Sequence, residues 1–336
     1  REKQPELFQW VLERVKPERD QNRDAPSREN WWVFARPRPE FRPSLIGTGN
    51  VIATSLTAKY RTFIRVAADA ICDSTTVMFA LPDAQHLGIL SSIVHETWAL
   101  AAGGTLEDRP RYNKSVCFEP FPFPTATPEQ QTRIRDLAEQ LDTHRKRQQA
   151  AHPDLTLTGM YNVVEKLRSG EALTAKERAI HEHGLVSVLR QLHDDLDAAV
   201  LDAYGWGDLL PLLRVAHGLS PLPLAGEVAP QARVRVASGQ AKTTSAEPPS
   251  PQPSPASGRG GQSREDAKRA FDEAILERLV VLNAERAAEE ARGLVRWLRP
   301  EFQNPQKQAK PVQAEMDTGA EAAAMPSAMP ASKPAP

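Results

Sequence analysis

Residues 109–124 of the 336-residue chain read RPRYNKSVCFEPFPFP, a polar and cationic stretch that runs into a segment with three phenylalanines and three prolines. Proline fixes one backbone angle, so its repeated use leaves this segment little conformational freedom. Phe118, Phe121 and Phe123 are expected to anchor the segment in the core. A loop held in this way would present residues 109–114 at a fixed height above the fold.

The sequence before this stretch has the pattern of short strands. Between residues 30 and 82, the runs NWWVFARP, NVIATSLT, RTFIRVA and STTVMFALP are rich in β-branched and aromatic residues and are separated by turn-forming residues. Such runs predict strands. Apolar periodicity predicts helices over residues 5–16 and 83–102, and Gly103 and Gly104 end the second of them.

The segment between the first helix and the first strand, residues 17–30, is highly charged and contains two prolines. We expect a loop or an extended arm. Two interpretations are open: a solvated connector, or an arm that contacts a phosphate backbone. The arm would use Arg19, Arg23 and Arg28.

The sequence after residue 124 is mostly helical in pattern. TPEQ at Thr127 and TAKE at Thr174 are capping boxes, in which a threonine hydroxyl and a Gln or Glu side chain satisfy the first amides of a helix. A further helix is expected to end near Gly205. Ser263 is expected to cap a long helix whose apolar stripe packs on the earlier helices. This stripe consists of Phe271, Ile275, Leu279 and Leu282.

These patterns predict an α+β fold. A mixed α/β domain is expected over residues 1–124 and an all-α helical domain over residues 125–218, completed by a long helix over residues 263–300. Residues 219–262 and 301–336 are rich in Pro and Ala and poor in residues that form a core. We therefore expect a disordered insertion and a disordered tail.

Composition and motifs argue against several classes of function. The formal net charge is −1, so any nucleic-acid surface must arise from a local arrangement of charge. The two cysteines are far apart, which favours a reducing, cytoplasmic location and excludes a disulfide framework. There is no glycine-rich phosphate loop, nucleophile elbow or HExxH motif, so no catalytic residue, cofactor or metal site is expected. No segment is long and apolar enough to span a membrane.

Positively charged and amide side chains gather on the predicted turns of the first domain. Arg and Lys can bond guanine, Asn can pair with adenine, and a carboxylate can accept a hydrogen bond from cytosine. The same groups can instead hold phosphates, and a basic solvated loop is the third interpretation. The candidate DNA contacts are Lys59, Arg61, Glu107, Arg109, Arg111, Asn113 and Lys114.

Five segments occur in an order that carries a resemblance to a known family. They read VLERVKPERDQNR, NWWVFARPRPEFRPSL, VIATSLTAKYRTF, WALAAGGTLEDRPRYNKSVCFEPFPFP and LDAAVLDAYGW. The series resembles the C-terminal half of the MmeI-like class of bacterial DNA methyltransferases, adenine-N6 enzymes related to type II restriction–modification proteins. The resemblance covers roughly residues 5–300 apart from the insertion, and its most specific part ends in Phe-Pro-Phe-Pro.

The resemblance implies a target-recognition domain over residues 1–124 and the family's helical domain after it. In that family a catalytic domain that binds S-adenosylmethionine, and in some members a nuclease, come before these domains. The family's methyl-donor glycine motif and its Asn-Pro-Pro-Tyr motif have no counterpart in this chain. Its first residues have the pattern of a helix, and we do not expect them to be a signal peptide. We therefore expect a piece from downstream of the catalytic domain, with double-stranded DNA as its partner.

Two other interpretations of function are open. The chain could be a helical interaction subunit that docks on a separately encoded methyltransferase and touches DNA only in that complex. It could also be a non-functional gene fragment. In every case S-adenosylmethionine is implied for the full-length family and not for this chain.

Overall fold

The computed structural model describes residues 3–33, 41–106, 109–219 and 257–305 of the chain. Residues 1–296 form one compact unit and residues 297–336 a second. The described part of the second unit contains the short helix α13 (Pro300–Gln303). None of the described helices is long and apolar enough to cross a membrane.

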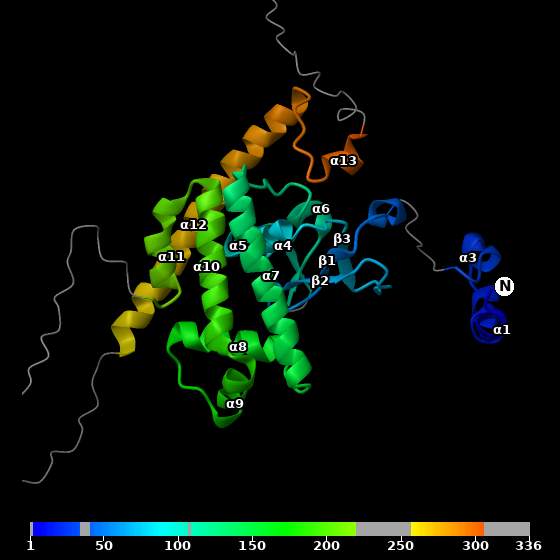
Figure 1. Ribbon diagram of the computed structural model, residues 1–336, viewed down its shortest axis with the longest axis horizontal. Coiled ribbons are helices and arrows are strands. Elements are labelled where there is room, and N and C mark those ends of the chain that lie inside the picture. Colours follow the sequence, from blue (N-terminus) through cyan, green and yellow to red (C-terminus); the bar gives the residue numbers. More distant parts are fainter. Residues whose placement is uncertain (1–2, 34–40, 107–108, 220–256, 306–336) are drawn as a thin grey trace, which may run out of the picture. The chain divides into compact units, whose positions relative to one another are not determined.

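The first unit contains a three-stranded antiparallel sheet with the strand order β2-β1-β3 (Figure 1). In its register, Ile52 of the central strand β1 lies opposite Arg65 of β2 and Phe79 of β3. Because side chains alternate between the two faces of a sheet, the buried Phe63 and Phe79 lie on the same face as Ile52. A second sheet is the hairpin formed by β4 and β5. The strands are β1 (Asn50–Ser55), β2 (Phe63–Ala67), β3 (Thr76–Phe79), β4 (Gly104–Leu106) and β5 (Arg109–Arg111).

The apolar sequence after β3 forms two helices, α4 (Ala84–Ser91) and α5 (Ile93–Ala102), instead of the single predicted helix. Ser92 interrupts them with an extended backbone (φ −80°, ψ 158°) and acts as the N-cap of α5. The Ile93 amide donates to Oδ1 of Asp197 at 2.7 Å. A residue from a distant helix therefore satisfies an amide at the start of α5 and stabilises the break.

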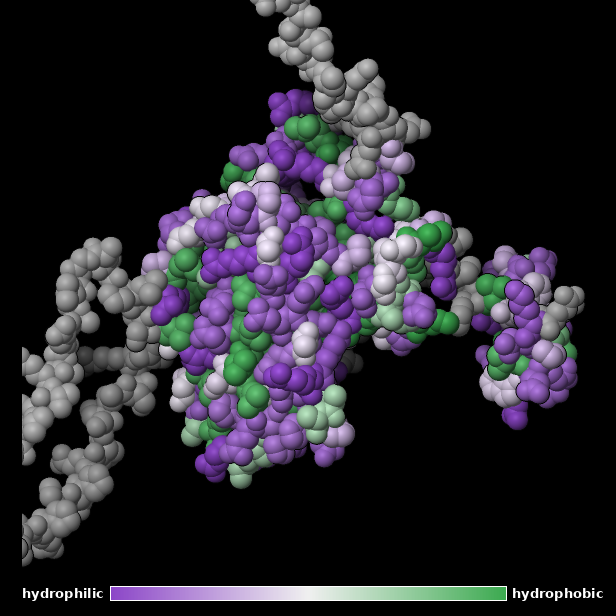
Figure 2. All heavy atoms as spheres, viewed as in Figure 1, coloured by the Kyte–Doolittle hydropathy of each residue, from purple (hydrophilic) through white to green (hydrophobic). Residues whose placement is uncertain are grey.

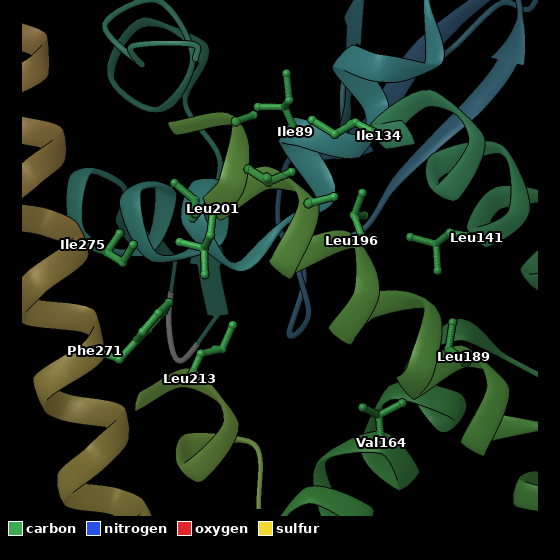
Figure 3. Packing of buried hydrophobic residues seen from close by; sticks show 14 of the residues in the cluster. Ile89, Ile134, Leu141, Val164, Leu189, Leu196, Leu201, Leu213, Phe271 and Ile275 are labelled. Atoms are coloured by element: carbon green, nitrogen blue, oxygen red, sulfur yellow. The ribbon is translucent and has the colours of Figure 1, made fainter. Parts of the chain in front are cut away.

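The helical part of the first unit is built on one apolar core (Figure 3). Leu196 and Leu201, from α10, lie at its centre, between Ile134 of α7 and Phe271 of α12. The capping boxes predicted at Thr127 and Thr174 are confirmed at the starts of α7 and α9. The helices are α7 (Pro128–Ala151), α8 (Leu157–Ser169), α9 (Ala175–Gly184), α10 (Val186–Tyr204), α11 (Leu210–Ala216) and α12 (Ser257–Ala291), with a 3₁₀ turn at Gly207–Leu209.

Helix α7 joins this helical part to the sheet through hydrogen bonds to the outer edge of β2. The fully buried Arg145 donates from Nη2 to the Phe63 carbonyl at 2.9 Å. The Arg65 amide donates to Asp142 at 3.3 Å, and Lys146 donates to the Arg65 carbonyl at 2.6 Å. Side chains of a helix thus take the place of a fourth strand and satisfy backbone groups that an edge strand leaves unpaired.

The α+β fold class is confirmed, and several boundaries differ from the sequence-based expectation. The predicted arm over residues 17–30 contains two short helices, and the run at residues 30–33 forms turns instead of a strand. Helix α8 was not predicted. The remainder of the run NWWVFARP, residues 34–37, lies outside the described residues. The N-terminal helices are α1 (Pro5–Arg14), α2 (Lys16–Asp20) and α3 (Ala25–Glu29).

Helix α12 also differs from its prediction at both ends. It begins at Ser257 and not at Ser263, so six residues of the predicted disordered insertion are helical. It stops at Ala291 because Gly293 takes a left-handed conformation (φ 85°), which ends a helix. Residues 301–303, assigned to the predicted disordered tail, are also helical and belong to α13. Residues 220–256 of the insertion and 306–336 of the tail lie outside the described residues.

The predicted boundary at residue 124 does not separate two independent cores. Ile89 and Val94, from α4 and α5, belong to the same apolar cluster as the helices after residue 124. The side chains over α7 and α10 in Figure 2 are mostly hydrophilic, with a narrow hydrophobic strip. These two helices therefore have one face in the common core and the other in solvent.

Candidate nucleic-acid interface

The β4–β5 hairpin contains the first part of the cationic stretch at residues 109–114. Arg109 and Arg111 are exposed on β5, whereas Tyr112, which follows, is only 1% exposed. This is the alternation of a strand with one face on the core. The two arginines therefore share the outward face. Glu107 lies outside the described residues.

Tyr112 anchors β5 in a cluster of aromatic rings. Its ring lies 5.6 Å from Phe63 and 6.0 Å from Phe79, in edge-to-face geometry with both. Its hydroxyl oxygen is 2.9 Å from Nε2 of His95. Burial lowers the pKa of His95 to about 3, so this imidazole is neutral at physiological pH. A neutral, fully buried partner lets the tyrosine hydroxyl enter the core with its hydrogen bond made.

The phenylalanines that follow extend the same cluster, as the sequence predicts. Phe118 packs on Phe79 with ring centroids 4.6 Å apart, and Phe121 packs on His95 at 4.4 Å. Phe123 contacts both Phe118 and Phe121. The hairpin therefore has aromatic anchors on its C-terminal side, where the chain leaves for α7.

Arg61 contacts the hairpin through the Pro110 carbonyl and the ring of Tyr112, which follows β5. It belongs to residues 56–62, which connect β1 to β2 and are called the support loop below. Its Nη2 donates to the Pro110 carbonyl at 3.1 Å, and its Nη1 donates to Thr54 and to the Ser55 carbonyl. Its guanidinium also lies 5.1 Å from the Tyr112 ring centroid. Burial lowers the pKa of Arg61. These contacts assign Arg61 mainly to positioning the hairpin.

The other candidate residues differ in how far their side chains are already engaged. Lys59 donates to Asn162 at 2.7 Å. Asn113 caps α6 (Lys114–Cys117) by accepting from Ser115, and Lys114 pairs with Glu119 at 2.7 Å while staying 66% exposed. For Arg111, the described residues provide no side-chain hydrogen bond or ion pair. Arg111 is therefore the candidate whose donors are best placed to meet a ligand.

Gly103 lies where the backbones of β5 and the end of α5 are close together. A Cβ there would lie 2.6 Å from the Ala99 carbonyl oxygen and 2.9 Å from the Arg111 carbonyl oxygen. Backbone atoms cannot move aside as flexible side chains do. We expect Gly103→Ala to displace β5 and to lower the free energy of unfolding by about 1–3 kcal/mol. Gly104→Ala is the control because a Cβ there meets nothing within 4 Å. Equal denaturation midpoints for the two variants would contradict this packing argument.

One group of side chains has the spacing of metal ligands. Ligand atoms of Asp194, Asp197 and His217 lie within 4.8 Å of one another. However, Asp194 already pairs with Arg168 at 2.8 Å and with His217 at 2.8 Å, and Asp197 accepts from the Ile93 amide. The guanidinium beside the group would repel a cation. These residues are explained by packing between α8, α10, α11 and α5.

The residues of α8 that face the support loop are not predicted by any pattern in the sequence. Asn162 and Glu165 accept hydrogen bonds from Lys59 and Tyr60, which are more than a hundred positions earlier in the chain. A single Asn and a single Glu in a helix carry no local signal. Only the packing of the helix against the loop identifies them.

The family described as the MmeI target recognition domain matches residues 3–125. Among solved structures, the type IIL restriction-modification enzyme MmeI in complex with DNA is similar to this chain, with 22% sequence identity and a TM-score of 0.43. This similarity covers 60% of this chain and 24% of that chain, so it spans about a quarter of the enzyme's length. No curated protein matches the chain. Over residues 3–125, the chain carries an MmeI-type target recognition domain.

Proposed function

We propose that this chain is the sequence-specific DNA-recognition portion of a site-specific adenine-N6 DNA methyltransferase of a restriction–modification system. The methyl-transfer chemistry, with its S-adenosylmethionine, would belong to polypeptide other than this chain. We place the protein in the cytoplasm, where bacterial DNA lies. The observation that carries the proposal is the pair of exposed arginines on a hairpin that is anchored on its other face by Tyr112.

The geometry suits reading of base edges. A strand hairpin can enter the major groove, and an arginine there can donate two hydrogen bonds to one guanine. A reading group must be held at a fixed height, because a bidentate contact tolerates little displacement. The aromatic anchors and Arg61 supply this support for Arg109 and Arg111. Glu107 stays a predicted reader, and Lys59, Asn113 and Lys114 are predicted phosphate or base contacts.

The test is selection from a pool of randomised DNA duplexes by the purified chain, with sequencing of the bound fraction. Wild type is expected to enrich a defined sequence. Arg111→Ala should lose about 1–3 kcal/mol of preference at one base position and keep the preference at the others. Arg178→Ala, an exposed arginine of α9, is the control and should leave the enriched sequence unchanged.

Two results would count against this assignment. If Arg111→Ala weakened binding to every duplex equally and reduced the salt dependence, Arg111 would be a phosphate contact. If the wild-type chain enriched no sequence at all, the chain would not read DNA by itself.

A second candidate function is docking on a separately encoded catalytic subunit. The observation that favours it is the exposure of Leu7 and Trp10 on α1 and of Trp32 in the turn after α3, which are 62%, 61% and 53% exposed. Large exposed aromatic groups are typical of protein interfaces. A chain with this function would shift no duplex in a gel without its partner, and it would shift one when the partner is added.

A further inference from the structure

The support loop is bonded to β5 along the edge that β4 leaves open. The Tyr112 amide donates to the Leu56 carbonyl at 2.7 Å, and the Ala58 amide donates to the Pro110 carbonyl at 3.3 Å. Thr57 and Arg111 form an antiparallel bridge. The backbone of Arg111 is thus paired with β4 on one side and with the support loop on the other. A shift of the support loop must therefore move the Arg111 backbone.

The far side of the support loop is fastened to α8. The Tyr60 hydroxyl donates to Glu165 Oε2 at 2.7 Å and lies 2.9 Å from Asn162 Oδ1, which also accepts from Lys59 at 2.7 Å. The Tyr60 ring stacks on Tyr161, with centroids 5.8 Å apart and planes 30° apart. Burial and the Glu165 carboxylate raise the pKa of Tyr60, so its hydroxyl keeps its proton at physiological pH.

Helix α8 is itself held rigidly. Thr156 caps its first turn, and Met160, Val163 and Val164 are buried in the helical core. Nη1 of Arg145 donates to the Tyr161 hydroxyl at 3.0 Å, while Nη2 of the same side chain bonds the sheet. A helix fixed at both its core face and its loop face is a firm base for the support loop.

We propose that α8 is a positioning element for the hairpin. Asn162 and Glu165, acting through Lys59 and Tyr60, set the position of Arg111 relative to the rest of the fold. This inference rests on the proposed function and deepens it: residues of the helical region determine specificity without touching DNA. The two acceptors are positioning residues. Their effect passes through two hydrogen bonds to a loop and from that loop through backbone bonds to β5.

A purely structural role for the same contacts predicts a different result. Exposed hydrogen bonds between two segments contribute little to stability, and their loss would leave the hairpin where it is. A positioning role requires that loss of the Tyr60 hydroxyl lowers discrimination between sequences while the affinity for random duplex stays the same. It also requires that the effect depends on Arg111.

The experiment compares Tyr60→Phe with Glu165→Gln by selection from randomised duplexes. Tyr60→Phe removes the hydroxyl and keeps the ring on Tyr161. Glu165→Gln keeps an oxygen that accepts from Tyr60 and is the conservative control. Tyr60→Phe is expected to reduce preference at the position read by Arg111 by about fivefold, the lower limit of what one bidentate base contact contributes. Glu165→Gln should retain the wild-type preference.

A double-mutant cycle tests whether the effect passes through Arg111. In an Arg111→Ala background, Tyr60→Phe should cause no further loss of preference at that position, because the group it positions is gone. Additive losses would mean that Tyr60 acts on DNA by another route and would overturn the inference.

Hydrogen exchange without DNA tests the positioning separately from DNA reading. In Tyr60→Phe, the amides of Ala58 and Tyr112 are expected to exchange faster than in wild type, while amides in α10 keep their protection. Unchanged exchange at Ala58 and Tyr112 would overturn the inference even if wild type selects a sequence. If wild type selected no sequence but exchange was faster in the variant, the proposed function would be rejected. The connection from α8 through the support loop to β5 would still hold.

Discussion

Replacing Phe271 with alanine is expected to lower the free energy of unfolding by about 3–5 kcal/mol, the range for truncating a buried aromatic residue. Phe271 is 1% exposed and points from α12 toward Leu213 of α11 (Figure 3). Ile275 and Leu279 continue the same buried stripe, so the side chains around Phe271 are held on several sides and cannot collapse into the cavity.

The prediction tests whether α12 is part of the core, although the long segment 220–256 separates it from α11 in the sequence. Chemical denaturation of the whole chain measures the effect as a lower midpoint. Val281→Ala is the control, since Val281 is on the same helix and 55% exposed, and such surface changes usually cost less than about 0.5 kcal/mol. If Phe271→Ala cost no more than Val281→Ala, α12 would not be part of the core.

Replacing Asp197 with asparagine is expected to stabilise the protein at neutral pH and to flatten the dependence of stability on pH. Burial raises the pKa of Asp197 from its ordinary value of 3.8 to about 8. Between these values the unfolded chain has released this proton and the folded chain still holds it. The free energy of unfolding therefore falls as pH rises, by up to about 1.4 kcal/mol per pH unit at this site. Below pH 3.8 the carboxyl is protonated in both the folded and the unfolded chain, so this site no longer lowers the free energy of unfolding.

Asparagine has no proton to release and keeps the oxygen that accepts from the Ile93 amide. The break between α4 and α5 should therefore be preserved. The measurement is denaturation of wild type and variant at several pH values from 4 to 8, a range that follows from the two pKa values. Asp195→Asn, a less buried neighbour on α10, is the control. A pH profile of Asp197→Asn that runs parallel to wild type would contradict the assignment of a neutral carboxyl.

Local patterns in the sequence were sufficient for several elements. The capping boxes at Thr127 and Thr174 were predicted because their hydrogen bonds join residues three positions apart. Three members of the α12 stripe are buried as expected, whereas Leu282 is half-buried at its edge. The aromatic anchors around Phe121 were predicted from the density of phenylalanine and proline.

Other features depended on contacts between distant residues. A continuous apolar pattern predicted one helix where α4 and α5 now meet, because the acceptor for the Ile93 amide is 104 positions away on α10. The start of α12 was placed too late because Ser263 offered a capping signal that a longer helix does not use.

The amino-acid order alone specified the α+β class, the amphipathic helices and a cationic stretch mounted on aromatic anchors, because hydrophobic periodicity and helix caps act over a few residues. It did not distinguish Arg61 from Arg111, which are the same residue type and were both expected on turns. The folded chain distinguishes them, since the half-buried Arg61 guanidinium packs against Tyr112 and the Pro110 carbonyl while Arg111 is exposed on β5. Burial depends on which segments meet in space, and no local pattern encodes that.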